Sequence, residues 1–152
     1  MSTLHMRLEK DLLGTKQVND AHYYGIQTLR ALENFDLTPN KLSNYPYFIQ
    51  ALAMVKLAAA EANYQLKLLP EAKYQAIQYA CEQLMQGQFL QEFPLDMLQG
   101  GAGTSTNMNA NEVIANRAEM LLHGRIDVAN RFISPNDDVN KSQSTNDVFP
   151  TA

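Results

Sequence analysis

The 152-residue sequence contains a single cysteine, Cys81, and no tryptophan. One cysteine cannot form an intramolecular disulfide, and the three histidines form no metal-binding cluster with it. We therefore expect no disulfide framework and no metal site. A chain of this kind suits a reducing compartment, and we expect it in the cytoplasm.

Runs of positive charge and long apolar runs are also missing. The formal net charge is −4, and no run of Lys or Arg could follow a phosphate backbone, so nucleic acid is not an expected partner. No segment reaches the roughly 18 uninterrupted apolar residues of a membrane-spanning helix. The charged start, MSTLHMRLEKDLLG, lacks the continuous apolar region of a secretion signal. The sequence therefore predicts a soluble protein without a membrane partner.

Hydrophobic residues make up 45% of the chain, enough for the core of about one domain. Apolar residues recur with the helical period in four segments, and a Gly14 turn joins strand-like residues near the start. The predicted helices are 22–35, 46–69, 70–87 and 108–124, and the predicted hairpin lies within 7–18. The expected fold is mainly α with a small β-hairpin near the amino terminus.

The stretch GGAGTSTNMNANE, residues 100–112, combines three glycines with three hydroxyls at a helix start. A glycine-rich turn before a helix exposes unpaired N–H groups at the positive end of the helix dipole and can bind an anion. The spacing matches neither a P-loop nor a dinucleotide fingerprint. Thr104, Ser105 and Thr106, which follow Gly103, suit a carboxylate better than a polyphosphate. The alternative is an ordinary helix cap on a glycine turn.

Asparagines are unusually frequent in the helix that follows. Asparagine costs a helix roughly 0.5 kcal/mol relative to alanine, so helix formation alone does not favour it. Asn109, Glu112 and Asn116 lie at positions i, i+3 and i+7, so they form one polar stripe on the helix. Asn107 and Asn111 lie beside this stripe. A polar stripe on a packed helix suggests that it lines a site.

A second polar loop, SPNDDVNKSQSTNDVFPTA, runs from 134 to 152 into another helix start. Ser144 and Asp147 have the spacing of a capping box, which is the structural alternative. The hydroxyls and amides are more numerous than one cap requires; they are Ser142, Ser144, Thr145, Asn146 and Asp147. Two hydroxyl-rich helix starts could hold both ends of a dicarboxylate.

These two motifs, with YYGIQTLRALENF near the start, resemble signature regions of the fumarase/aspartase superfamily over nearly the whole chain. Fumarases typically carry Ser where this chain has Ala102, Trp-Gly where it has Tyr24-Gly25, and His where it has Ser134. The resemblance is therefore stronger to the aspartase branch. It implies the amino-terminal helical domain of that fold, with residues 1–140 in it and 141–152 beginning the central helical bundle.

The resemblance also implies a reaction, the reversible anti-elimination of ammonia from L-aspartate to give fumarate through an enediolate, without a cofactor. In the family, hydroxyls matching Thr104, Ser144 and Thr145 stabilise the enediolate. A residue matching Asn146 contacts the amino group. Fumarate hydratase, or a non-catalytic dicarboxylate-binding and assembly domain, remains the alternative.

The resemblance places no catalytic residue in this chain, because the serine base of the family belongs to a Gly-Ser-Ser loop without a counterpart here. The chain alone is expected to be inactive, and the full-length family members are homotetramers. Glu112 and Asp147 are a conceivable acid/base pair, although structural hydrogen bonding is the favoured reading. We expect supporting roles around the site for Gly103, Ser105, Asn107, Asn109, Glu112, Ser142 and Asp147.

Overall fold

The computed structural model describes residues 5–152; the charged start noted above begins in residues 1–4, outside the described residues. Helices dominate, as expected. They are α1 (Ile26–Asn34), α2 (Pro46–Gln65), α3 (Glu71–Met85), α4 (Thr104–His123) and α5 (Thr145–Thr151), with single turns η1 (Leu42–Asn44) and η2 (Leu90–Glu92) and the π-helical η3 (Pro135–Val139). The prediction of a mainly α fold is confirmed.

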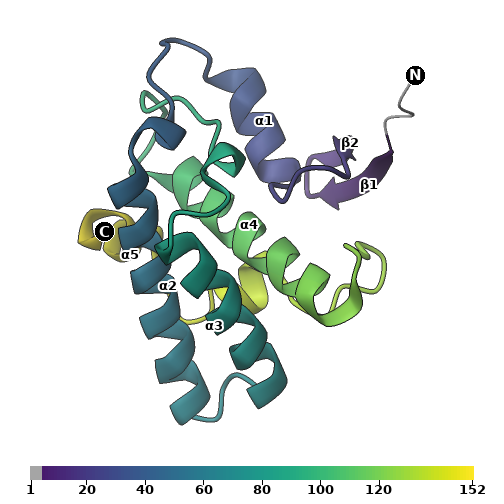
Figure 1. Cartoon of the computed structure of the whole chain (residues 1–152). Coiled ribbons are helices and arrows are strands. Elements are labelled where there is room, and N and C mark those ends of the chain that lie inside the picture. The colour runs from purple at the N-terminus through teal and green to yellow at the C-terminus, as the bar shows by residue number, and fades with distance from the viewer. Residues whose placement is uncertain (1–4) are drawn as a thin grey trace.

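The predicted hairpin is present as β1 (Met6–Asp11) and β2 (Gly14–Asn19), which pair antiparallel from Met6 opposite Asn19 to Asp11 opposite Gly14. Gly14 has φ +117°, a conformation that other residues rarely adopt, so the turn needs glycine there. The hairpin lies beside α1 at one end of the molecule (Figure 1). The buried Arg7 holds it there by donating to the carbonyl oxygens of Asn19, His22 and Tyr24.

Helices α2 and α3 run side by side, and α4 crosses them to reach α1 (Figure 1). Their facing apolar residues form the core, which includes Ile49, Ala53, Ile77, Ala80, Val113, Ile114 and Ala118. Chain segments far apart in sequence therefore meet on α4. Among residues 5–152, no helix is both long enough and apolar enough to cross a membrane.

Three helix boundaries differ from the predictions. The first helix begins at Ile26, and Tyr23 and Tyr24 before it donate their backbone N–H groups to the side chain of Glu92. Helix α2 ends at Gln65, since Lys67 adopts φ +60° and the chain turns so that Leu69 is buried. Helix α4 begins at Thr104, four residues before the predicted start. Short-range periodicity marks the body of a helix better than its ends.

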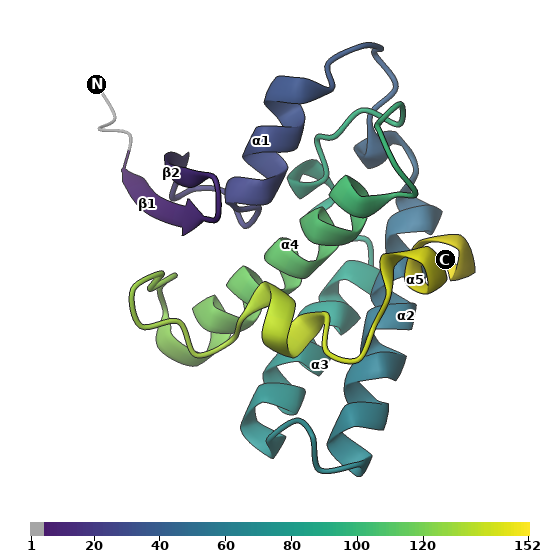
Figure 2. The ribbon, with the colours of Figure 1, turned by 180° about the vertical axis from the view of Figure 1, so that it is seen from behind.

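The carboxy-terminal segment runs back across α4 and α2, as Figure 2 shows from behind. Helix α5 packs against both α2 and α4. The ring of Phe149 stacks edge-on against Phe48 of α2 and covers Gly103 at the start of α4. Gly103 has φ +79°, and a Cβ there would collide with the Phe149 ring, so only glycine allows this close packing.

Candidate functional site

The first helix start, at α4, uses no hydroxyl as a cap. Gly103 is the N-cap and has no side chain to accept a hydrogen bond. The Gln99 side chain accepts from the backbone N–H of Thr106 at 3.0 Å instead. Thr104 is exposed and Ser105 is partly exposed. Capping therefore does not account for these two hydroxyls, which sit on the first turn of α4.

The second helix start, at α5, does use a hydroxyl as a cap. Ser144 Oγ caps α5 by accepting from the backbone N–H of Asn146 at 3.3 Å. The capping box expected from the sequence would have paired Ser144 with Asp147 instead. Accepting this bond leaves the Ser144 hydroxyl hydrogen for another acceptor. Ser144, Asn146 and Asp147 are all exposed.

The structure brings the two helix starts together. Asn107, one turn into α4, donates through Nδ2 to Thr145 Oγ1 at 3.1 Å, and the Phe149 ring covers Gly103 as described above. The exposed hydroxyl of Thr104 and the α5 start therefore belong to neighbouring parts of one surface. This contact spans 38 residues of sequence, and the spacing of either motif could not have predicted it.

Beneath Thr145 lies a buried polar cluster that the motifs did not reveal. Asn140 Oδ1 accepts from Asn107 Nδ2 at 3.0 Å, from Asn111 Nδ2 at 3.2 Å and from Lys56 Nζ at 2.9 Å. Lys56 is fully buried, and burial lowers its pKa to about 7 although the neighbouring Cys81 opposes the change. The available signal was a lysine in the middle of an apolar helix, ALAMVKLAAA.

The other polar residues of α4 face the opposite side and hold η2 and the amino-terminal segment. Asn109 donates to the carbonyl oxygen of Glu92 at 2.9 Å, and Asn116 donates to that of Tyr23 at 2.7 Å. The Asn109–Glu112–Asn116 stripe therefore binds protein backbone, while Asn107 and Asn111 face the cluster around Asn140. The expected single polar stripe is in fact two sets on two faces.

Glu112 caps α1 from α4. Its carboxylate accepts from the backbone N–H groups of Gly25, Gln27 and Thr28 at 2.8–3.0 Å and from the Thr28 hydroxyl at 2.7 Å. Burial raises the pKa of Glu112, and the hydrogen bonds from Thr28 and Gln27 act in the opposite direction. With Asp147 exposed on α5, the favoured structural reading of Glu112 agrees with its contacts.

Ser142 anchors the loop before α5. It adopts φ +58°, and its hydroxyl donates to Asn63 Oδ1 of α2 at 2.9 Å. This bond and the Asn63 amide bond to the carbonyl oxygen of Lys141 fix the loop on α2. The Ser142 side chain thus supports the position of Ser144 and Thr145.

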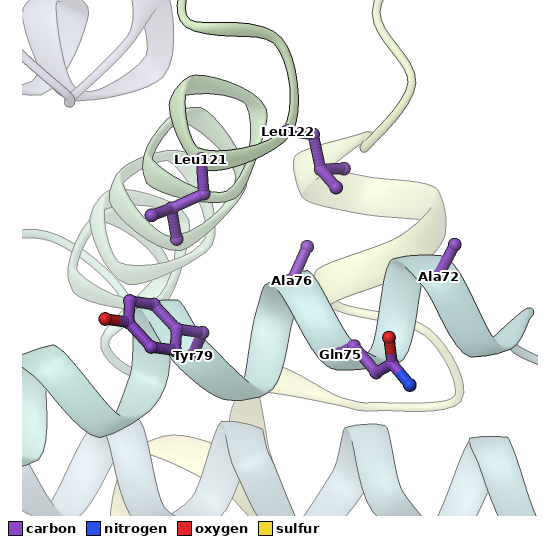
Figure 3. A pocket seen from close by; sticks show the side chains of 6 residues that line it. All are labelled: Ala72, Gln75, Ala76, Tyr79, Leu121 and Leu122. Atoms are coloured by element: carbon purple, nitrogen blue, oxygen red, sulfur yellow. The ribbon is translucent and has the colours of Figure 1, made fainter.

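A separate apolar groove lies between α3 and the carboxy-terminal end of α4, which is the end opposite to Thr104 (Figure 3). Its volume is about 320 Å³, and it is lined by Ala72, Gln75, Ala76, Tyr79, Leu121 and Leu122. One amide and one phenol are its only polar side-chain groups, so it has no charge to pair with a carboxylate. The groove does not match the chemistry expected of the motifs.

The domain is mainly helical, and its two hydroxyl-rich helix starts meet on one surface. The family model described as "Lyase" matches residues 14–152, and the chain belongs to this lyase family. The curated relatives carry the name of one enzyme within this family. Aspartate ammonia-lyase of Pseudomonas aeruginosa is 58% identical over 147 residues, and that of Escherichia coli K12 is 48% identical over 149 residues. These alignments cover 96% and 97% of this chain.

Solved structures agree with this placement. A fumarate lyase:delta crystallin from Brucella melitensis matches with a TM-score of 0.92 and 55% identity, covering 96% of this chain and 34% of that one. A class II fumarase from Schistosoma mansoni matches with a TM-score of 0.90 and 39% identity, covering 96% and 30%. The chain spans about 31% of the length of the two aspartate ammonia-lyases it matches.

Proposed function

We propose that these residues form the amino-terminal part of an aspartate ammonia-lyase, which converts L-aspartate reversibly to fumarate and ammonia. The observation that carries the proposal is the contact between Asn107 and Thr145, which joins the two hydroxyl-rich motifs into one surface. The 48–58% identity to enzymes named aspartate ammonia-lyase supports the choice of substrate.

In this proposal the surface supplies donors to one carboxylate of the substrate. Removing the proton next to that carboxylate moves negative charge onto its oxygens, so donors aimed at them stabilise the transition state more than the ground state. Thr104 and Ser144 are exposed for this role, and Thr145 Oγ1 lies between them and the buried cluster. Asn146 would contact the amino group. The base that removes the proton is not among these residues.

The remaining residues of the two loops support the donors. Gly103 allows α4 to approach α5, and Ser142 fixes the second loop on α2. We assign Ser105 and Asp147, which flank the exposed hydroxyls, to the rim of the site. Asn109 and Glu112 act indirectly, because Asn109 holds η2 against α4 and Glu112 holds α1 against it.

The assembly and location of the enzyme are part of the same proposal. We propose a homotetramer in the cytoplasm, with the partners supplying groups that this chain lacks. The apolar groove in Figure 3, whose lining includes the half-exposed Tyr79 and Leu122, is a surface that such contacts would cover.

Fumarate hydratase is the second candidate, favoured by the 39% identity to the class II fumarase. The test is to assay the full-length product of the gene that encodes this chain with L-aspartate and with fumarate. Ammonia release from L-aspartate with negligible malate formation is the expected result. Malate formation at a comparable or higher rate would replace the proposal with the fumarase alternative.

Assays of the polypeptide of residues 1–152 by itself test whether it holds a complete active site or only the part that binds one end of the substrate. We expect no ammonia release, because a base must lie within hydrogen-bond reach of the proton it removes. Calorimetry should show at most millimolar affinity for fumarate or succinate, about 4 kcal/mol of binding free energy, since one side of the ligand would be held. Micromolar binding, or turnover after host aspartase is removed, would show a self-contained site.

A further inference from the structure

The buried cluster beneath Thr145 has a fixed direction of hydrogen bonding. Lys56 Nζ is a donor, and its two acceptors are Asn140 Oδ1 and Gln143 Oε1, each at 2.9 Å. Even without its charge a lysine amine keeps two N–H groups, so both acceptors are served on either side of its pKa of about 7. Lys56 therefore favours the orientation in which the Asn140 oxygen points into the cluster, and the bond from Asn140 Nδ2 to the carbonyl oxygen of Gln143 at 3.4 Å agrees with it.

The orientation of Asn140 sets that of Asn107. Because the Asn140 oxygen accepts hydrogen bonds, Asn107 must present its NH₂ group to it. The two hydrogens of this group go to Asn140 Oδ1 at 3.0 Å and to Thr145 Oγ1 at 3.1 Å. Thr145 Oγ1 is thus an acceptor on its inner side. Its own hydrogen is left for an acceptor other than Asn107.

This arrangement leaves acceptors of the cluster unused. Within the described residues, the amide oxygens of Asn107 and Asn111 are buried without a hydrogen-bond partner. Rotating the Asn107 amide would let its oxygen accept from the Thr145 hydroxyl and so satisfy one of them. After that rotation, two donors or two acceptors would face each other at one of the contacts between Asn107, Asn140 and Lys56. The lysine at the far end prevents it.

We propose that Lys56 is a positioning residue that, through Asn140 and Asn107, makes the Thr145 hydroxyl donate outward to the substrate carboxylate. The inference rests on the proposed function, and it deepens the account of that same site. It assigns a role to a lysine that touches no substrate. Without Lys56, Asn140 and Asn107 can reverse, and the Thr145 hydrogen turns inward.

A double-mutant cycle in the full-length enzyme tests this, with kcat and KM measured for Lys56→Met, Thr145→Val and the pair. Losing one such donor costs roughly 10²-fold in kcat, so each single variant should lose about that factor while KM moves less. In the Thr145→Val background, Lys56→Met should cost less than about threefold, because the hydroxyl it directs is gone. Equal losses in both backgrounds would overturn the inference, as would full activity of Lys56→Met.

Two isosteric substitutions test the direction of hydrogen bonding independently of Lys56. Asn107→Asp presents only acceptors and should draw the Thr145 hydrogen inward, with a loss of roughly 10²-fold in kcat. Asn140→Asp keeps acceptors toward Lys56 and Asn107 and should lose far less. The opposite ranking would refute the mechanism even if Lys56→Met failed to fold.

The control is Lys73→Met, because Lys73 pairs with Asp138 at 2.8 Å beside the same η3 segment but donates to no residue of the cluster. Its kcat should equal that of the wild type. A wild type that releases no ammonia from L-aspartate would refute the proposed function. If it hydrates fumarate instead, the same cycle measured on that reaction decides the inference; if it does neither, the inference falls with the proposal.

Discussion

Glu112→Gln is expected to destabilise the fold, because Glu112 holds the start of α1 through four hydrogen bonds from across the molecule. Glutamine has nearly the same shape but only one acceptor atom. Its oxygen can replace Oε2, which accepts from Gly25 and Thr28. Its NH₂ group then faces the backbone N–H of Gln27, where the carboxylate has Oε1 at 2.8 Å. The substitution sets two donors against each other.

The size of the effect follows from these contacts. A hydrogen bond to a charged group contributes about 1.5–3 kcal/mol, and a buried donor left without a partner costs about 1–3 kcal/mol. Burial raises the pKa of Glu112, so desolvation of the carboxylate offsets part of the stabilisation from these hydrogen bonds. We therefore expect Glu112→Gln to lower the free energy of unfolding by about 2 kcal/mol. Glu112→Ala leaves three backbone N–H groups without the carboxylate and should cost about 5 kcal/mol, close to the whole stability of a small domain.

Urea unfolding followed by circular dichroism measures both differences, and Glu112→Gln should also lower Tm by roughly 4–8 °C. The same variant assayed in the full-length enzyme separates structure from chemistry. If Glu112 were an acid or base, Glu112→Gln would abolish turnover and leave Tm unchanged. An unfolding free energy within about 0.5 kcal/mol of wild type would refute the capping argument, since that is the range of uninvolved surface substitutions.

Three further outcomes are expected. Thr104→Ala or Ser144→Ala in the full-length enzyme should lower kcat by roughly 10²-fold with a smaller change in KM, and a loss of Tm with kcat intact would indicate a structural role only. The pKa of Lys56 is lowered from 10.5 to about 7, so the unfolded chain binds more protons between those values and stability rises with pH there, by on the order of 5 kcal/mol. Lys56→Met should remove that rise; an unchanged pH profile of unfolding would contradict it. Gly103→Ala should cost more than about 2 kcal/mol through its φ of +79° and the collision with Phe149, and a wild-type melting curve would refute this.

Helix content, the hairpin and the two motifs were predictable because they depend on residues close together in sequence. The apolar period of α2 and α3 and the turn at Gly14 express local backbone and burial preferences. The resemblance to the lyase family likewise came from continuous stretches, and the family match over residues 14–152 confirms it. The substrate contacts of Thr104 and Ser144 stay predictions.

The helix ends and the use of the asparagines were not predictable in the same way. Asn109 and Asn107 look equivalent along the helix, yet one binds the backbone of Glu92 and the other binds Asn140 and Thr145. A helix places residues on faces, but the sequence does not say which segment packs on each face.

The sequence by itself thus determined the bodies of the helices, the hairpin, the two hydroxyl-rich motifs and the family. Only the tertiary structure decided that the two starts meet, that Glu112 caps α1 and that Lys56 donates into a buried cluster. The reason is that each of these bonds joins residues that lie far apart in the sequence and that chain packing brings together. Lys56 and Asn140, for example, are 84 residues apart. Buried polar groups must find partners, and the packing of α4 against α1, α2 and α5 decides which partners those are.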